Sequence, residues 1–242
     1  MKLNKAATPP PTLIDPAYDY PGYRSTEFRA PKSPVLPLPR GLTEQMGPVF
    51  GPERLQPGDH DLTAGHPGEP LGERIVVSGR VTDSAGRPVR HQLVEVWQAN
   101  AAGRYHHEVD RHVAPLDPNF TGAGRCLTDG DGRYRFVSIK PGAYPWANHT
   151  NAWRPAHIHF SVFGLSFAER LVTQMYFPGD PLLAIDPIFQ SVRDRRAADL
   201  LVARFDLATT VEGWALGYTF DIVVGGPVAT PVEPRNERAA TP

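Results

Sequence analysis

Tyr-Pro-Trp-Ala-Asn-His-Thr-Asn-Ala-Trp-Arg-Pro-Ala-His-Ile-His, residues 144–159, is the stretch around which the chain is organised. His157 and His159 lie two residues apart in a run that is otherwise mostly apolar or β-branched. Alternate side chains of a strand share a face, so both imidazoles are expected on one face and Ile158 and Phe160 on the other. Two imidazoles on one strand face form half of a metal site. The alternative is a pair of polar residues on a solvated face.

The composition limits what kind of protein this is. The chain has 242 residues, of which 40% are hydrophobic and 21% charged, so it can form a proper core as one large β domain or two small ones. A net charge of −1 gives no electrostatic reason to expect binding to nucleic acid or to an anionic membrane.

The single cysteine, Cys126, excludes an intrachain disulfide and fits a reducing compartment. We expect it to be buried in the core. The first twelve residues have no apolar core of a signal peptide, and no apolar run approaches the ~18 residues of a membrane span. These features predict a soluble, cytoplasmic protein without a membrane partner.

Proline and glycine are abundant, with 27 and 22 residues, and the prolines cluster near the N-terminus. Residues 1–70 are therefore predicted to form an extended, proline-rich arm. The arm carries Tyr18, Tyr20, Tyr23 and Phe28, and we expect these aromatic rings to pack along a surface, such as that of a partner. The polar tail, residues 227–242, is expected to be mobile.

Residues 71–226 show the pattern of an all-β domain. Short alternating or valine-rich runs bounded by turn residues predict strands at 74–82, 89–97, 134–137, 156–163, 171–177 and 218–224. One short helix is expected at 191–205, where Ser191 and Asp194 have the spacing of a capping box. The predicted fold is an antiparallel β-sandwich with an extended N-terminal arm and one short helix.

Completing a metal site needs donors beyond the histidine pair. Tyr144 in Gly-Ala-Tyr-Pro-Trp and Tyr105 in Gly-Arg-Tyr-His-His are candidates, although a tyrosine near a proline is more often a packing residue. His106 and His107 are also possible ligands. Adjacent residues of an extended segment face opposite ways, so only some of this group could reach one metal.

Five motifs occur in a characteristic order and spacing: Trp97-Gln98-Ala99-Asn100, Gly103-Arg104-Tyr105, Ala114-Pro115-Leu116-Asp117-Pro118-Asn119-Phe120, Pro141-Gly142-Ala143-Tyr144-Pro145-Trp146 and Trp153-Arg154-Pro155-Ala156-His157-Ile158-His159-Phe160. Together they resemble the intradiol ring-cleavage dioxygenase family, and most closely the β subunits of its protocatechuate-cleaving members. The resemblance covers about residues 23–224 and implies that residues 71–226 are a catalytic domain.

The resemblance implies a non-haem Fe(3+) ion bound by Tyr105, Tyr144, His157 and His159 with a solvent hydroxide. The chemistry of the donors agrees, because a tripositive ion can keep phenolates, whose pKa is ordinarily about 10, deprotonated at neutral pH. Two phenolates and a hydroxide also neutralise the charge of Fe(III). Zinc sites seldom use tyrosine, and a ferrous oxygenase would use two histidines and one carboxylate.

The family pattern also implies roles in catalysis. Tyr144 is the ligand that leaves the metal and takes a substrate proton, Arg154 stabilises the developing negative charge, and Gln174 orients Arg154. Tyr23, Trp146 and Ile188 match positions that line the substrate pocket.

The function implied by the resemblance is intradiol cleavage of protocatechuate (3,4-dihydroxybenzoate) by O2 to 3-carboxy-cis,cis-muconate in the β-ketoadipate pathway. A homologous α subunit is the implied partner, in an (αβ)n hetero-oligomer. Ala147 departs from the arginine usual after Tyr-Pro-Trp, which leaves another 4-substituted catechol, such as 4-sulfocatechol, as an alternative substrate. A non-catalytic binding subunit of the same fold is the alternative from another class. Catechol and hydroxyquinol dioxygenases carry a helical segment ahead of the β domain, and residues 1–70 are too rich in proline for one.

Overall fold

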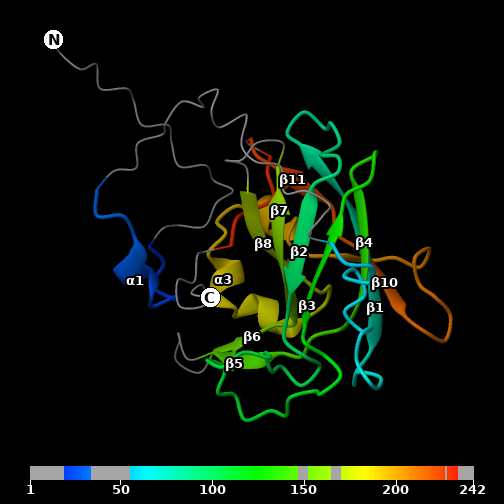
Figure 1. Ribbon diagram of the computed structural model, residues 1–242. Helices are drawn as coiled ribbons and strands as arrows, with labels where there is room; N and C mark the ends of the chain where they lie inside the picture. The colour runs from blue at the N-terminus through cyan, green and yellow to red at the C-terminus, as the bar shows by residue number, and fades with distance from the viewer. Residues whose placement is uncertain (1–18, 34–54, 147–151, 165–169, 227, 234–242) are drawn as a thin grey trace.

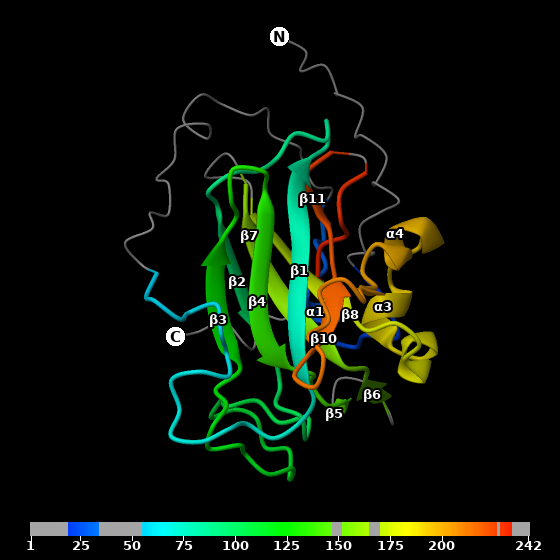
Figure 2. The same ribbon diagram turned by 90° about the vertical axis from the view of Figure 1, so that its right-hand side faces the viewer.

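Two β-sheets pack against each other in a sandwich in the computed structural model, which describes residues 19–33, 55–146, 152–164, 170–226 and 228–233 (Figures 1 and 2). The predicted all-β fold is confirmed. The first sheet contains β1 (Arg74–Asp83), β4 (Arg133–Ile139), β9 (Arg204–Phe205), β10 (Leu216–Thr219) and β11 (Ile222–Val224). The second has the order β3 (Ala123–Leu127), β2 (Leu93–Trp97), β7 (His157–Phe163) and β8 (Arg170–Tyr176).

Smaller elements lie around the sandwich. A two-stranded sheet is formed by β5 (Tyr144–Trp146) and β6 (Ala152–Arg154), and the helices are α1 (Thr26–Arg29), the 3₁₀ helix η2 (Pro181–Ala184), α3 (Pro187–Gln190) and α4 (Arg195–Asp199). In Figure 1, α1 and α3 lie on the side of the second sheet that faces away from β1 and β4. No helix in the described ranges is long and apolar enough to span a membrane.

The main core lies between the two sheets because strand periodicity places one apolar row of each sheet inside. Ile158 and Phe160 of β7 are fully buried there and belong to the same hydrophobic cluster as Phe136 of β4. The rings of Phe136 and Phe160 meet edge to face with centroids 5.8 Å apart, a favoured aromatic geometry. Cys126 is buried in this core, as expected.

The first sheet differs from the purely antiparallel prediction. β1 pairs antiparallel with β4, but it pairs parallel with β10 and then with β11. The strand predicted at 218–224 is broken between β10 and β11. At the break the Asp221 side chain, instead of a backbone carbonyl, accepts the hydrogen bond from Arg80 N, at 2.9 Å. Gly79 allows the close approach at this break, since a Cβ atom there would lie 1.8 Å from the Phe220 carbonyl oxygen.

The single helix predicted at 191–205 is wrong. α3 ends before this segment, and α4 is capped by Asp194, which accepts a hydrogen bond from Arg196 N, so Ser191 does not begin a capping box. After α4 the chain becomes extended because Tyr176, at the end of β8, exchanges backbone hydrogen bonds with Leu201 and Ala203. Contacts with a distant strand override the local helical pattern.

The two terminal segments of the prediction lie mostly outside the described residues. Of the predicted arm, residues 19–33 contain the one-turn helix α1, and residues 55–70 consist mainly of turns. Of the predicted tail, residues 228–233 are described, and Thr230 within them is buried.

Candidate metal centre

The histidine pair lies at the start of β7, in the middle of the second sheet. His157 and His159 point to the face opposite the core and are 2% and 8% exposed, so this face is covered as well. Their ring centroids are 4.9 Å apart. β2 pairs Trp97 with His159 on one side, and β8 pairs Gln174 with it on the other. The predicted orientation of the two imidazoles is confirmed.

Tyr105 reaches the histidines from the loop that follows β2. Asp110 holds this loop, because its carboxylate accepts a hydrogen bond from Tyr105 N at 2.8 Å. The guanidinium of Arg104 donates to the carbonyl oxygen of Ala114 at 3.0 Å and also to that of His112, which closes the loop around it. The backbone at Tyr105 is thus braced on both sides.

Tyr144, the first residue of β5, approaches from the opposite direction. Gly103 makes this approach possible: it has a positive φ of 79°. A Cβ atom at Gly103 would lie 2.3 Å from the Ala143 carbonyl oxygen. Only glycine therefore fits between the loops that carry the two tyrosines. The rings of Tyr105 and Tyr144 meet edge to face with centroids 5.6 Å apart.

The four predicted ligands converge on one point. Tyr105 Oη lies 3.0 Å from His159 Nε2, and Tyr144 Oη lies 3.4 Å from His157 Nε2. His106 and His107, the other possible ligands, are exposed on the surface. No group of three or more His, Cys, Asp or Glu side chains that could hold a metal occurs in the part of the chain that the structure describes. The donor set here is two imidazoles and two phenols.

Hydrogen bonds at the far side of each ring set its tautomer. His157 Nδ1 lies 2.7 Å from the Pro155 carbonyl oxygen, which only accepts, so Nδ1 carries the proton and donates it. His159 Nδ1 donates in the same way to the Glu233 carboxylate at 2.8 Å. Each Nε2 is therefore the nitrogen that faces a phenol oxygen and that a metal would bind.

Burial sets the ionisation of these groups. It lowers the pKa of His157 well below its usual range, with further lowering by Arg154 and His159, so this imidazole is neutral and can bind a metal. Burial also raises the pKa values of Tyr105 and Tyr144. Both are phenols unless a cation at the site reverses the effect of burial. Two imidazole nitrogens and two ionisable phenol oxygens fit a hard, highly charged metal ion.

Arg154, predicted to stabilise negative charge, is 3% exposed beside the ligands. Its Nε lies 3.0 Å from a carboxylate oxygen of Asp186, and its Nη2 donates to Gln174 Oε1 and, at 3.2 Å, to Tyr176 Oη. Gln174 therefore contacts Arg154, as the sequence predicts. Burial alone lowers the pKa of Arg154, but Asp186 and the nearby tyrosines raise it well above its ordinary value. The guanidinium is a permanent positive charge.

The three predicted pocket residues lie on the same side of this centre. The Tyr23 ring meets Trp146 edge on with centroids 4.7 Å apart, and the Arg154 guanidinium lies 5.7 Å from the Trp146 ring. Ile188 is buried in α3, two residues after Asp186. Ala147 lies outside the described residues.

Three residues of the centre were missed by sequence reasoning: Asp186, Tyr176 and Glu233. Asp186 precedes a proline, which indicates a helix cap, but nothing local links it to Arg154. Tyr176 lies in a predicted strand and resembles any core residue. Glu233 belongs to a polar, proline-bearing segment that carries no signal of its contact with His159.

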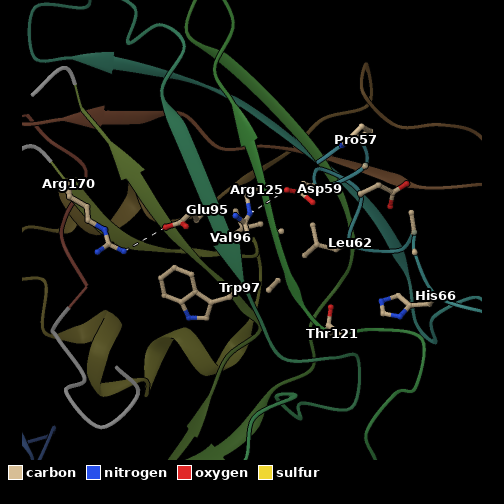
Figure 3. Close-up of a pocket in the computed structure, with 16 residues that line it drawn as sticks. Pro57, Asp59, Leu62, His66, Glu95, Val96, Trp97, Thr121, Arg125 and Arg170 are labelled. Carbon is tan, nitrogen blue, oxygen red and sulfur yellow. Dashed lines mark ion pairs between the residues drawn. The ribbon is translucent and has the colours of Figure 1, made fainter. Parts of the chain in front are cut away.

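An open groove of about 560 Å³ lies at the β3 end of the second sheet, between β2, β3 and the segment 57–66 (Figure 3). Trp97 lines it and stacks on the His159 ring with centroids 4.9 Å apart. Two ion pairs cross the groove, Arg170 with Glu95 at 3.8 Å and Arg125 with Asp59 at 3.5 Å. The groove contains none of the four predicted ligands.

The comparisons with known proteins agree with this fold. Residues 45–226 match the dioxygenase family described as Dioxygenase_C. The chain belongs to this family, the intradiol ring-cleavage dioxygenases.

Individual members of the family differ in how similar they are to this chain. Over 220 residues the chain is 66% identical to the protocatechuate 3,4-dioxygenase beta chain of Burkholderia cepacia, covering 90% of this chain and 93% of that protein. It is 36% identical over 167 residues to 6-chlorohydroxyquinol 1,2-dioxygenase of Cupriavidus pinatubonensis, covering 62% of this chain and 56% of that protein. The crystal structure of catechol 1,2-dioxygenase from Pseudomonas arvilla C-1 superposes with a TM-score of 0.51 at 26% identity, covering 74% of this chain and 59% of that one.

Proposed function

We propose that this chain is the iron-binding subunit of an enzyme that cleaves protocatechuate between its two hydroxyl-bearing carbons with O2, giving 3-carboxy-cis,cis-muconate. The observation that carries the proposal is the convergence of Tyr105, Tyr144, His157 and His159 with their donor atoms facing one another. The 66% identity to a protocatechuate 3,4-dioxygenase beta chain supports the substrate. The name of that relative also supports an α subunit as partner, in an (αβ)n assembly.

The metal that best suits these residues is Fe(3+), because two phenols beside two imidazoles form a hard, anionic donor set once the phenols ionise. When bound, the ferric ion chelates the catechol as a Lewis acid and activates its ring for reaction with O2. A non-catalytic binding subunit would not need two imidazoles, each held by a hydrogen bond at Nδ1, aligned with two phenols.

Tyr144 and Arg154 act on the substrate itself. With a metal bound, Tyr144 would be a phenolate, and its Oη could then accept the proton of a substrate hydroxyl and become a phenol. Its ring borders the histidine pair, and its backbone pairs with Arg154. Arg154 then places a fixed positive charge beside the oxygen atoms on which negative charge develops. Gln174, Tyr176 and Asp186 hold the guanidinium in place, so no reorganisation is required during the reaction.

Trp146, Tyr23 and Ile188 form the apolar wall near which the substrate ring would lie. The edge-to-face contact between Tyr23 and Trp146 brings the N-terminal segment against the centre and excludes water from that side. Water exclusion strengthens the electrostatic effect of Arg154.

The first experiment tests the metal. The chain is co-expressed with its α subunit, and iron content and visible absorption are measured for the wild type, His157→Ala and His159→Ala. We expect a wine-red wild type, from charge transfer between phenolate and Fe(III), and a sharp loss of iron in both variants. His106→Ala is the control, since His106 is exposed and should leave iron content unchanged. An iron-replete but colourless wild type would exclude phenolate ligands.

The second experiment tests the substrate. O2 uptake by the red complex is compared for protocatechuate, 4-sulfocatechol and catechol. We expect the highest kcat/KM for protocatechuate, with one O2 consumed per ring opened. A clear preference for 4-sulfocatechol would instead assign the alternative that Ala147 suggests.

A further inference from the structure

The C-terminal segment 228–233 returns across the second sheet instead of leaving the domain. Gly225 and Gly226 have φ values of 73° and 82°, a conformation that favours glycine and reverses the chain after β11. Thr230 then pairs with β11: its N–H donates to the Val223 carbonyl oxygen and its Oγ1 accepts from Val223 N, both at 3.0 Å. We call residues 228–233 the C-terminal strap.

Two further hydrogen bonds join the strap to β8, the edge strand of the second sheet. Thr173 Oγ1 donates to the Pro231 carbonyl oxygen at 2.7 Å, and Glu233 N donates to the Val172 carbonyl oxygen at 2.7 Å. Thr173 is fully buried. These bonds hold the backbone of Glu233 beside β8, the strand that pairs with the His159 strand β7.

The Glu233 side chain completes the surroundings of the His159 ring. One face of the ring stacks on Trp97 with an interplanar angle of 5°, and Nδ1 donates to Glu233 Oε2 at 2.8 Å. Only Nε2 remains, and it faces Tyr105 Oη. The His157 Nδ1 instead donates to the uncharged carbonyl of Pro155. The two imidazoles thus differ in the charge of the group behind them.

We propose that Glu233 is the positioning residue that makes His159 a stronger metal donor than His157. A carboxylate that accepts the Nδ1 proton draws positive charge to that side of the ring and leaves more electron density at Nε2. It also prevents the ring from flipping, because a flip would remove the hydrogen bond. This role rests on the proposed function, since it requires a metal at the four donors.

The test compares wild type, Glu233→Gln and Glu233→Ala, each as the complex with its partner subunit. Glutamine can still accept from Nδ1 through its amide oxygen but carries no charge, so the fold is preserved while the proposed effect is removed. Glu212→Gln is the matched control, since Glu212 is exposed in the segment between β9 and β10.

Three quantities are measured: the rate of iron loss to a chelator, the thermal midpoint with and without iron, and the phenolate-to-iron absorption band. We expect Glu233→Gln to lose iron about 10–100-fold faster, the usual cost of removing such an outer partner, and Glu233→Ala to lose it faster still. The band should move to longer wavelength because the iron becomes poorer in electrons. The thermal midpoint of the iron-free protein should stay as in wild type for Glu233→Gln.

Two results would overturn the role of Glu233. Iron loss and absorption of Glu233→Gln equal to those of wild type would show that its charge does not act on His159. Equal falls in thermal midpoint with and without iron would assign Glu233 a structural role only. A wild-type complex that holds no iron would instead contradict the proposed function itself, so the two failures are distinguishable.

Discussion

At the scale of single residues, the two tyrosines have the same chemistry but different surroundings. Tyr105 faces His159, and its loop is braced by Asp110 and by Arg104. Tyr144 faces His157 and is paired across β5 and β6 with Arg154. Burial raises the pKa of Tyr144, but the positive charge of Arg154 lowers it and so favours the phenolate form that a metal would bind. The role of Tyr144 as the ligand that takes a substrate proton is implied by the family pattern and stays a prediction.

Replacing each tyrosine by phenylalanine separates these roles. Tyr144→Phe should keep iron through Tyr105 and the histidines but lose a proton acceptor, so turnover should fall by about 10²–10⁴-fold. Anaerobic mixing with substrate in a stopped-flow spectrometer should then show slow chelation in resolvable steps. Tyr105→Phe should change the absorption band both before and after substrate is added. If Tyr144→Phe chelates substrate as fast as wild type, the proton goes elsewhere.

Cys126 provides a prediction that depends on pH. Burial raises the pKa of its thiol from 9.0 to about 12, so the folded state favours the protonated form and contributes stability below pH 9 that is lost as pH rises toward 12. At pH 8 only about 10⁻⁴ of the folded thiol is thiolate, against roughly a tenth when unfolded. A disulfide reagent should therefore label the native protein very slowly and the denatured protein at once. Rapid labelling of native protein would mean that the core opens at β3.

At the scale of elements, α3 connects helix capping to catalysis. Asp186 caps α3 by accepting hydrogen bonds from Ile188 N and Phe189 N, and the same carboxylate neutralises Arg154. It is fully buried. A one-turn helix therefore determines where the positive charge of the site lies, although it contributes no metal ligand.

Asp186→Asn tests this connection. Asparagine can still cap the helix, but it leaves the Arg154 charge buried without its carboxylate partner. The free energy of unfolding should therefore fall by about 4 kcal/mol. Denaturant unfolding should show this loss. Asp194→Asn, at the cap of α4, is the matched control, and it should cost well under ~1 kcal/mol because asparagine caps as well as aspartate. Equal small losses in both variants would mean that Arg154 does not depend on Asp186.

At the scale of the whole molecule, several large apolar side chains do not join the core. Phe28 on α1 is 85% exposed, whereas Tyr23, three residues before that helix, is fully buried. On the opposite side of the chain, Phe205, Leu207 and Trp214 around β9 and β10 are also exposed. Exposed apolar side chains mark a subunit interface where they gather into one contiguous patch.

We therefore predict that the chain needs its α subunit. Purified alone it should aggregate or be poorly active, and co-expression should give a soluble, red, active complex, measured by size-exclusion chromatography and O2 uptake. Phe28→Ser should weaken the complex, whereas Val113→Ser, at an equally exposed position in the loop after Tyr105, is the control. A monomeric chain that turns over protocatechuate at full rate without a partner would contradict this prediction.

The amino-acid sequence by itself determined the β-sandwich and the shared face of His157 and His159. These features follow from strand periodicity and from short motifs, so they can be read within a few residues. Only the tertiary structure decided where the predicted strand at 218–224 breaks and why 191–205 does not form one helix. It also decided that Asp186 and Glu233 belong to the centre. Glu233 lies 74 residues from His159 and Asp186 lies 32 residues from Arg154, and no local pattern encodes such contacts, because they form only when separate elements pack together.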